Sequence, residues 1–138
     1  MDRQIAKEKL TESDKVNALG RLATGTDLKK AVAEADLVVE AATENTAIKL
    51  QLFKDIDAHA PAACILASNT SSISITKIAA QTSRPDKVIG MHFMNPVPVM
   101  RLVEIIRGYS TSDAVCDAVI EMSKALGKVP VACNDYPG

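Results

Sequence analysis

Residues 67–104 read ASNTSSISITKIAAQTSRPDKVIGMHFMNPVPVMRLVE, and the rest of the fold is organised around this stretch. Three apolar runs in and beside it are typical of buried β-strands, namely Cys64–Ala67, Val88–Met91 and Leu102–Ile106. Each run meets small or ionisable polar groups at or near its end. Because ligands of open α/β sheets bind outside the carboxyl ends of the strands, we expect these polar groups to gather in one crevice.

Two titratable residues in this stretch are candidates for chemistry. Glu104 is a lone carboxylate inside an apolar strand, where burial is costly unless another group pairs with it. His92 is one of only two histidines in the chain and is the obvious partner. We therefore predict a His92–Glu104 pair; the alternative is a core histidine whose ring bonds to a backbone carbonyl. His59 has no comparable neighbours and is expected on the surface.

The composition limits the class of protein. The chain has 138 residues, enough for one domain with a sizeable core, and it is 47% hydrophobic and 24% charged, as globular domains are. Its net charge of −1 gives no support for a nucleic-acid or anionic-membrane partner. No apolar run approaches the length of a membrane span.

The cysteines, Cys64, Cys116 and Cys133, are odd in number and widely spaced. None of them pairs at the spacing of metal ligands, so we expect no metal site and three free thiols that pack as small buried hydrophobes. Free thiols indicate a reducing compartment, and we predict a cytoplasmic protein. No signal peptide appears at the start, although the first residues already read as helix interior, so an upstream targeting segment stays open.

Apolar strands alternate with helical patterns along the chain. Strands are expected at residues 37–42, 64–67, 88–92, 101–106 and 129–133, with helices in the connections. Near the N-terminus, Thr11 followed by Asp14 predicts a capped helix start, with Val16, Leu19 and Leu22 following at three-residue spacing. The alternation predicts an α/β fold with a parallel or mostly parallel sheet.

Four short motifs at fixed separations resemble one enzyme family. They are SNTSS at residues 68–72, GMHFMNPVP at 90–98, LVE at 102–104 and NDYPG at 134–138. Together they resemble the L-3-hydroxyacyl-CoA dehydrogenases, the bacterial 3-hydroxybutyryl-CoA enzymes most of all, and the match extends over nearly the whole chain. The resemblance implies a Rossmann-type, doubly wound sheet. It also implies NAD-dependent oxidation of a short-chain (3S)-3-hydroxyacyl-CoA to a 3-ketoacyl-CoA, or the reverse, in fatty-acid or butanoate metabolism.

The same resemblance assigns roles to individual residues. It implies that His92 is the general base, that Glu104 orients it, and that Ser71 and Asn95 contact the acyl-CoA substrate. For the cofactor NAD it implies contacts from Ala41, Glu44, Lys49 and Asn69. From the residues alone, Ser71 and Asn95 also pass as ordinary turn residues. Glu44 and Lys49 also pass as solvated charges in a first helical turn.

The sequence departs from the family's pattern at both ends. The family begins with a strand and a Gly-rich G-x-G-x-x-G turn whose helix holds the pyrophosphate. No three glycines here have that spacing. We therefore predict an interior piece that lacks the first β-α-β unit and the C-terminal helical domain. Residues 1–133 would be the second part of the NAD domain and 134–138 the start of a linker. The isolated chain would be inactive, and the full-length protein a homodimer.

Two non-catalytic roles remain as alternatives. One is a structural protein of the crystallin type, since some relatives of this family serve in the lens. The other is a truncated product that binds a partner or acyl-CoA without turnover. Retention of Ser71, His92, Asn95 and Glu104 together favours the enzyme.

Overall fold

A computed structural model of the protein describes residues 1–7 and 10–136. It contains a five-stranded sheet in the order β1-β2-β3-β4-β5. The strands are β1 (Leu37–Glu40), β2 (Ile65–Ser68), β3 (Val88–Phe93), β4 (Leu102–Arg107) and β5 (Val129–Asn134). β1, β2 and β3 run parallel, β4 is antiparallel to β3, and β5 is parallel to β4. The predicted mostly parallel α/β sheet is confirmed.

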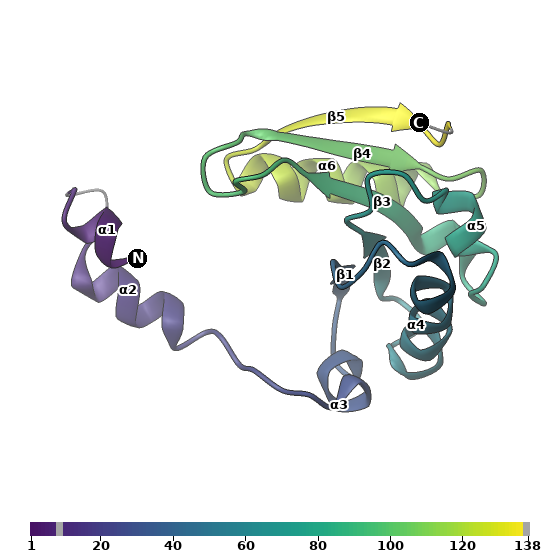
Figure 1. The fold of residues 1–138 in the computed structure, drawn as a ribbon, viewed down its shortest axis with the longest axis horizontal. Coiled ribbons are helices and arrows are strands. Elements are labelled where there is room, and N and C mark those ends of the chain that lie inside the picture. The colour runs from purple at the N-terminus through teal and green to yellow at the C-terminus, as the bar shows by residue number, and fades with distance from the viewer. Residues whose placement is uncertain (8–9, 137–138) are drawn as a thin grey trace.

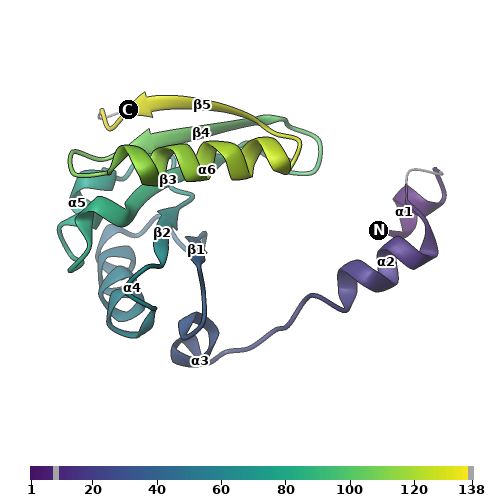
Figure 2. The ribbon, with the colours of Figure 1, turned by 180° about the vertical axis from the view of Figure 1, so that it is seen from behind.

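Helices cover both faces of this sheet, as a doubly wound fold requires. They are α3 (Leu28–Val32), α4 (Thr46–His59), α5 (Ile75–Ala79) and α6 (Asp113–Ala125), with a 3₁₀ turn at Pro85–Lys87. α6 lies along β3, β4 and β5 on one face, whereas α4 and α5 lie on the other (Figures 1 and 2). The central strands β2 and β3 are therefore sandwiched between two helical layers, whereas β5 is mostly exposed.

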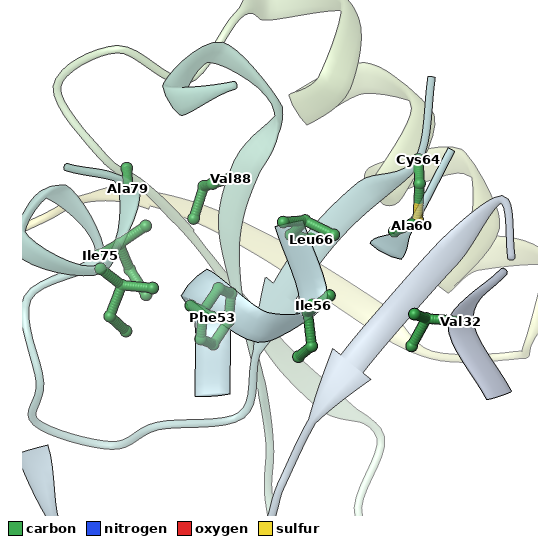
Figure 3. Close-up of a cluster of buried hydrophobic side chains, with 10 residues drawn as sticks. Val32, Phe53, Ile56, Ala60, Cys64, Leu66, Ile75, Ala79 and Val88 are labelled. Carbon is green, nitrogen blue, oxygen red and sulfur yellow. The ribbon is translucent and has the colours of Figure 1, made fainter. Parts of the chain in front are cut away.

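Alternation along the strands divides the core into two clusters, because successive strand residues face opposite sides of the sheet. Leu66 and Val88 face α4 and α5 and pack with Phe53 (Figure 3). Their chain neighbours Ala67 and Ile89 face α6. The core contains mostly aliphatic side chains, as the low aromatic content predicts.

Side-chain caps fix where the main helices begin. Asn45, Ser74 and Ser112 each accept a hydrogen bond from a backbone amide in the first turn of α4, α5 and α6, which satisfies one otherwise unpaired N–H. Gly127, at φ 73°, ends α6 in the left-handed conformation that glycine tolerates best.

The segment after β5 is tied back to the domain by Asp135. Its carboxylate accepts hydrogen bonds from the Ser74 hydroxyl at 2.7 Å and from the amides of Ile75 and Thr76 at 3.1 and 2.8 Å. Burial alone would raise the pKa of Asp135, but these donors outweigh it and hold that pKa below its usual range. Asn134 is the last residue of β5, and residues 137 and 138 of the predicted linker lie outside the described part of the chain.

The N-terminal helices α1 (Asp2–Ile5) and α2 (Glu12–Leu19) extend away from the sheet on an extended segment (Figures 1 and 2). The predicted cap is confirmed as a capping box between Thr11 and Asp14. The evenly spaced apolar residues do not face a core, however, because Val16, Leu19 and Leu22 are 65%, 48% and 69% exposed.

Candidate active site

The predicted His92–Glu104 pair is formed. The two residues are register partners on the antiparallel strands β3 and β4, so their side chains leave the sheet on the same face. His92 Nδ1 lies 2.8 Å from Glu104 Oε2. The two side chains are 21% and 40% exposed, so both groups reach solvent.

The reason for the pairing differs from the expected one. Glu104 lies in the interior of β4 and comes to His92 through antiparallel register, not because the carboxyl ends of parallel strands meet. Its carboxylate is also less buried than an apolar strand suggests. Neighbours on alternating sides explain this: Val103 and Ile105 are fully buried against α6, whereas Glu104 faces the opposite, open side.

A pocket of about 240 Å³, here called the His92 pocket, opens beside this pair. Ile75 and Ile106 contribute apolar side chains to its lining, and Ser71 joins His92 and Glu104 there. The other residues that line it are Thr70, Ser72, Ile73, Cys133, Asn134, Asp135 and Tyr136. Asn95, the second predicted substrate residue, is exposed and lies outside this lining.

Three of the predicted cofactor residues meet at a second, smaller opening, here called the Glu44 pocket. Ala41, Glu44 and Asn69 line it together with Ala42 and Thr43, and its volume is about 230 Å³. It lies where β1 and β2 end, which is the usual ligand position in an open α/β sheet. The Asn69 side-chain oxygen accepts a hydrogen bond from the Phe93 amide at 2.8 Å, which fixes the end of β2 against β3.

Lys49, the fourth predicted cofactor residue, lies below the surface. It is in the first turn of α4 but only 1% exposed, so its interpretation as a solvated charge is wrong. Its ammonium group forms a buried ion pair with Glu40 and lies 3.3 Å from the Ser68 hydroxyl. Glu44, which precedes the helix and has a half-exposed side chain, is 4.0 Å away on the pocket side.

Sequence reasoning missed Glu40 and Ser68. They are register partners on β1 and β2 and face α4, from which Lys49 reaches them. Glu40 carries the same signal that identified Glu104, a lone carboxylate within an apolar strand. Burial alone would raise the pKa of Glu40, but hydrogen bonds from Lys49, the Ala42 amide and Ser68 outweigh it and leave that pKa below its usual range.

Comparison with known proteins identifies the fold's relatives. Residues 1–136 match the family model described as "3-hydroxyacyl-CoA dehydrogenase, NAD binding domain". The chain belongs to this family. The resemblance carried by the four sequence motifs is thereby confirmed.

Curated members of the 3-hydroxyacyl-CoA dehydrogenase family match nearly the full length of the chain. A probable 3-hydroxybutyryl-CoA dehydrogenase of Bacillus subtilis is 48% identical, over 99% of this chain and 47% of its own length. The mitochondrial hydroxyacyl-coenzyme A dehydrogenase of Homo sapiens is 47% identical, over 99% of this chain and 45% of its own. A crystal structure of the (S)-3-hydroxybutyryl-CoA dehydrogenase PaaH1 from Ralstonia eutropha superimposes with a TM-score of 0.95, at 55% identity, covering 99% and 48% of the two chains. The chain thus spans about half the length of these relatives.

Membership of the family implies NAD as cofactor, and the Glu44 pocket fits part of it. A ribose presents hydroxyl donors, for which the half-exposed Glu44 carboxylate is a suitable acceptor. The small side chains of Ala41 and Ala42 allow a ligand to approach the backbone closely. The residues that line this pocket therefore suit a ribose of the cofactor.

Residues 1–7 and 10–136 lack two features of other protein classes. They contain no helix that is both long and apolar enough to cross a bilayer. In the same part of the chain, no three His, Cys, Asp or Glu side chains are grouped as metal ligands. The three cysteines are free, but only Cys64 and Cys116 are buried as expected, and burial raises the pKa of both thiols. Cys133 is exposed and lines the His92 pocket.

Proposed function

We propose that this chain contributes the catalytic pair and the nicotinamide side of a 3-hydroxyacyl-CoA dehydrogenase. The reaction is oxidation of the 3-hydroxyl of a short-chain (3S)-3-hydroxyacyl-CoA, such as 3-hydroxybutyryl-CoA, or reduction of the 3-keto group. The observation that supports it best is the His92–Glu104 pair at the edge of a pocket that also contains Ser71.

The pair is suited to moving the hydroxyl proton. An imidazole titrates near neutral pH and is therefore an effective general base without much tuning. With Nδ1–H donating to Glu104, the other ring nitrogen of His92 is left free to accept a proton. The Glu104 carboxylate then stabilises the imidazolium that forms, as the carboxylate does in a Ser-His-Asp triad.

The remaining residues bind and orient. We assign Ser71 a hydrogen bond to the substrate oxygen, and we keep Asn95 as a substrate contact. Ala41, Glu44 and Asn69 would hold the nicotinamide half of NAD, with Lys49 acting from below through Glu44. NAD bound there would supply the acceptor for the hydride that leaves C3 of the substrate.

The experiment is a hydride-transfer assay in which acetoacetyl-CoA is reduced by NADH. Because the chain spans about half of its relatives' length, it should be run on the purified protein and on a chimera. The chimera carries residues 1–136 in place of the matching region of the Bacillus subtilis relative. We expect the chimera to turn over, and His92→Gln to lower kcat by about 10²- to 10⁴-fold.

His59 provides the matched control. It is exposed on α4, its Nδ1 lies 2.7 Å from the Asp55 carbonyl oxygen, and it lines neither pocket. His59→Gln should leave kcat unchanged. A folded chimera without turnover, or equal activity in both histidine variants, would refute the proposal.

Association and compartment extend the same proposal. The free thiols of Cys64, Cys116 and Cys133 suit a reducing compartment such as the cytoplasm. We also expect the full-length enzyme to be a homodimer. Its substrate would be an acyl-CoA. Gel filtration with light scattering of the chimera tests the dimer.

A further inference from the structure

The turn that carries Ser71 is held by a side chain. Ser72 and Ile73 follow Ser71 directly, and no backbone–backbone hydrogen bond involves their amides within residues 1–7 and 10–136. Both amides instead donate to Thr70 Oγ1, at 3.3 and 3.0 Å. The backbone of the turn is therefore held mainly by one hydroxyl oxygen that precedes Ser71, and a longer hydrogen bond of 3.5 Å runs from Ser72 Oγ to Glu44 Oε2.

That hydroxyl is fully used. A threonine hydroxyl has one donor and two acceptor sites. Thr70 donates to Glu44 Oε2 at 2.8 Å and accepts from the two amides of the turn. The residue is only 3% exposed, so water does not compete for these sites. A buried, fully satisfied polar group of this kind makes its surroundings rigid.

The acceptor of this hydrogen bond is itself anchored. Glu44 lies 4.0 Å from the ammonium group of Lys49, which the buried Glu40 and Ser68 fix in place. Glu44 also lines the Glu44 pocket, whereas Thr70 lines the His92 pocket. The Thr70–Glu44 hydrogen bond therefore ties the wall of one pocket to the wall of the other.

We propose that Thr70 is a positioning residue for Ser71, and that Glu44 sets its orientation. This inference rests on the proposed function, in which Ser71 binds the substrate oxygen. Thr70 Oγ1 bonds to the two amides that follow Ser71 and also to Glu44. Through these hydrogen bonds Thr70 keeps the Ser71 hydroxyl at one place in the His92 pocket. Because Thr70 donates to Glu44, the position of the Ser71 hydroxyl also depends on the wall of the Glu44 pocket, where the nicotinamide half would bind.

The kinetic test compares Thr70→Val, which keeps the shape and removes the hydroxyl, with Thr70→Ser, which keeps the hydroxyl. In the NADH-dependent reduction of acetoacetyl-CoA by the chimera, Thr70→Val should lower kcat/KM by about 10- to 100-fold, since small displacements of a binding group cost that much. Thr70→Ser should restore most of it. Equal loss in both variants would overturn the proposal.

A double-variant cycle separates positioning from a general effect on the fold. If Thr70 acts through Ser71, Thr70→Val should lower kcat/KM by less than about threefold in a Ser71→Ala background. If the two losses multiply instead, Thr70 acts elsewhere and the proposal is wrong.

Amide hydrogen exchange provides a readout that does not depend on turnover. In the 138-residue chain, Thr70→Val should speed exchange at Ser72 and Ile73 about tenfold or more relative to Thr70→Ser. Should Thr70→Val fail to fold, Glu44→Ala removes a half-exposed side chain and should speed the same two amides. Unchanged exchange overturns the positioning role, whereas absent turnover with this exchange pattern refutes only the proposed function.

Discussion

Removing the cation of the buried Glu40–Lys49 pair should destabilise the protein severely. Both side chains are nearly inaccessible, at 2% and 1% exposed. In Lys49→Met the Glu40 carboxylate keeps the Ala42 amide and the Ser68 hydroxyl, at 2.8 and 3.0 Å, but has no opposite charge. Breaking a buried pair from one side costs about 3–5 kcal/mol, a large part of the usual stability of a domain.

The pH dependence of this loss follows from the same geometry. In the wild type the pKa of Glu40 lies below its ordinary value of 4.5, so its contribution is present above that pH and is lost only as the pH falls through the lower, folded value. Without Lys49, burial should raise the pKa of Glu40, because the unpaired carboxylate can avoid the cost of a buried charge by taking up a proton. For a carboxyl with the ordinary pKa of 4.5, taking up a proton costs about 3.4 kcal/mol at pH 7 but about 0.7 kcal/mol at pH 5. The deficit of Lys49→Met should therefore shrink as the pH is lowered from 7 to 5.

The assay is urea unfolding followed by circular dichroism at both pH values, with linear extrapolation to water. The double variant Glu40→Gln/Lys49→Met should recover most of the loss, because it leaves no buried charge. The exposed pair Glu121–Lys124 on α6, at 2.7 Å, is a matched control, and Lys124→Met should cost less than about 1 kcal/mol. A Lys49→Met deficit under about 1 kcal/mol at pH 7, or an equal deficit at both pH values, would refute the reasoning.

Three further variants test other parts of the structure. Gly90→Ala should cost about 1–3 kcal/mol in urea unfolding, because its Cβ would lie 2.7 Å from Ile106 Cβ, whereas Gly25→Ala, with open space around it, should cost far less. Asp135→Asn should lower the free energy of unfolding at neutral pH and reduce its dependence on acid pH. Because the pKa of Asp135 is lowered in the folded protein, this carboxylate stabilises the wild type above the ordinary value of 3.8, and the stabilisation disappears as the pH falls. The plots of unfolding free energy against pH for the wild type and the variant should therefore converge in acid. Glu104→Gln in the chimera should lower kcat by at least about tenfold and move the acid limb of the pH–rate profile; a change confined to KM for NADH would make it a structural residue.

Much of the fold could be predicted because local signals agree with the tertiary structure. The strands 37–42, 64–67, 88–92, 101–106 and 129–133 match the observed β1 to β5 within two residues. Ser74 and Ser112 were recognisable as caps because short hydroxyl side chains satisfy the first amides of a helix wherever it packs. The His92–Glu104 pair was predicted from a lone carboxylate in an apolar strand, although antiparallel register rather than burial brings the two residues together.

The direction of β4 was not predicted, although the chain contains the signal. Only residues 94–101 connect β3 to β4. A parallel crossover needs a dozen or more residues, usually including a helix, whereas antiparallel neighbours need only a loop. The longer connection from β4 to β5, which contains α6, is consistent with the parallel pairing observed there.

Two other features depended on packing that no local pattern reveals. Lys49 is on the first turn of a helix, where charges are usually solvated, and its burial follows from the position of α4 over Glu40 and Ser68. Conversely, the spacing of Val16 and Leu19 is typical of a helix that faces a core, but α2 has no neighbouring layer to pack against in the described structure.

Glu40 and Glu104, the two carboxylates that interrupt apolar strands, have different roles because their surroundings differ. Glu40 is sealed with Lys49, so neither group can exchange a proton with a substrate, and the pair can act only by holding the loop that leads to Glu44. Glu104 is 40% exposed and is paired with the His92 imidazole at a pocket, so a ligand in that pocket can reach the pair. In the proposed hydride transfer, the buried pair would hold the wall of the Glu44 pocket in place, and the exposed pair would receive the substrate proton in the His92 pocket.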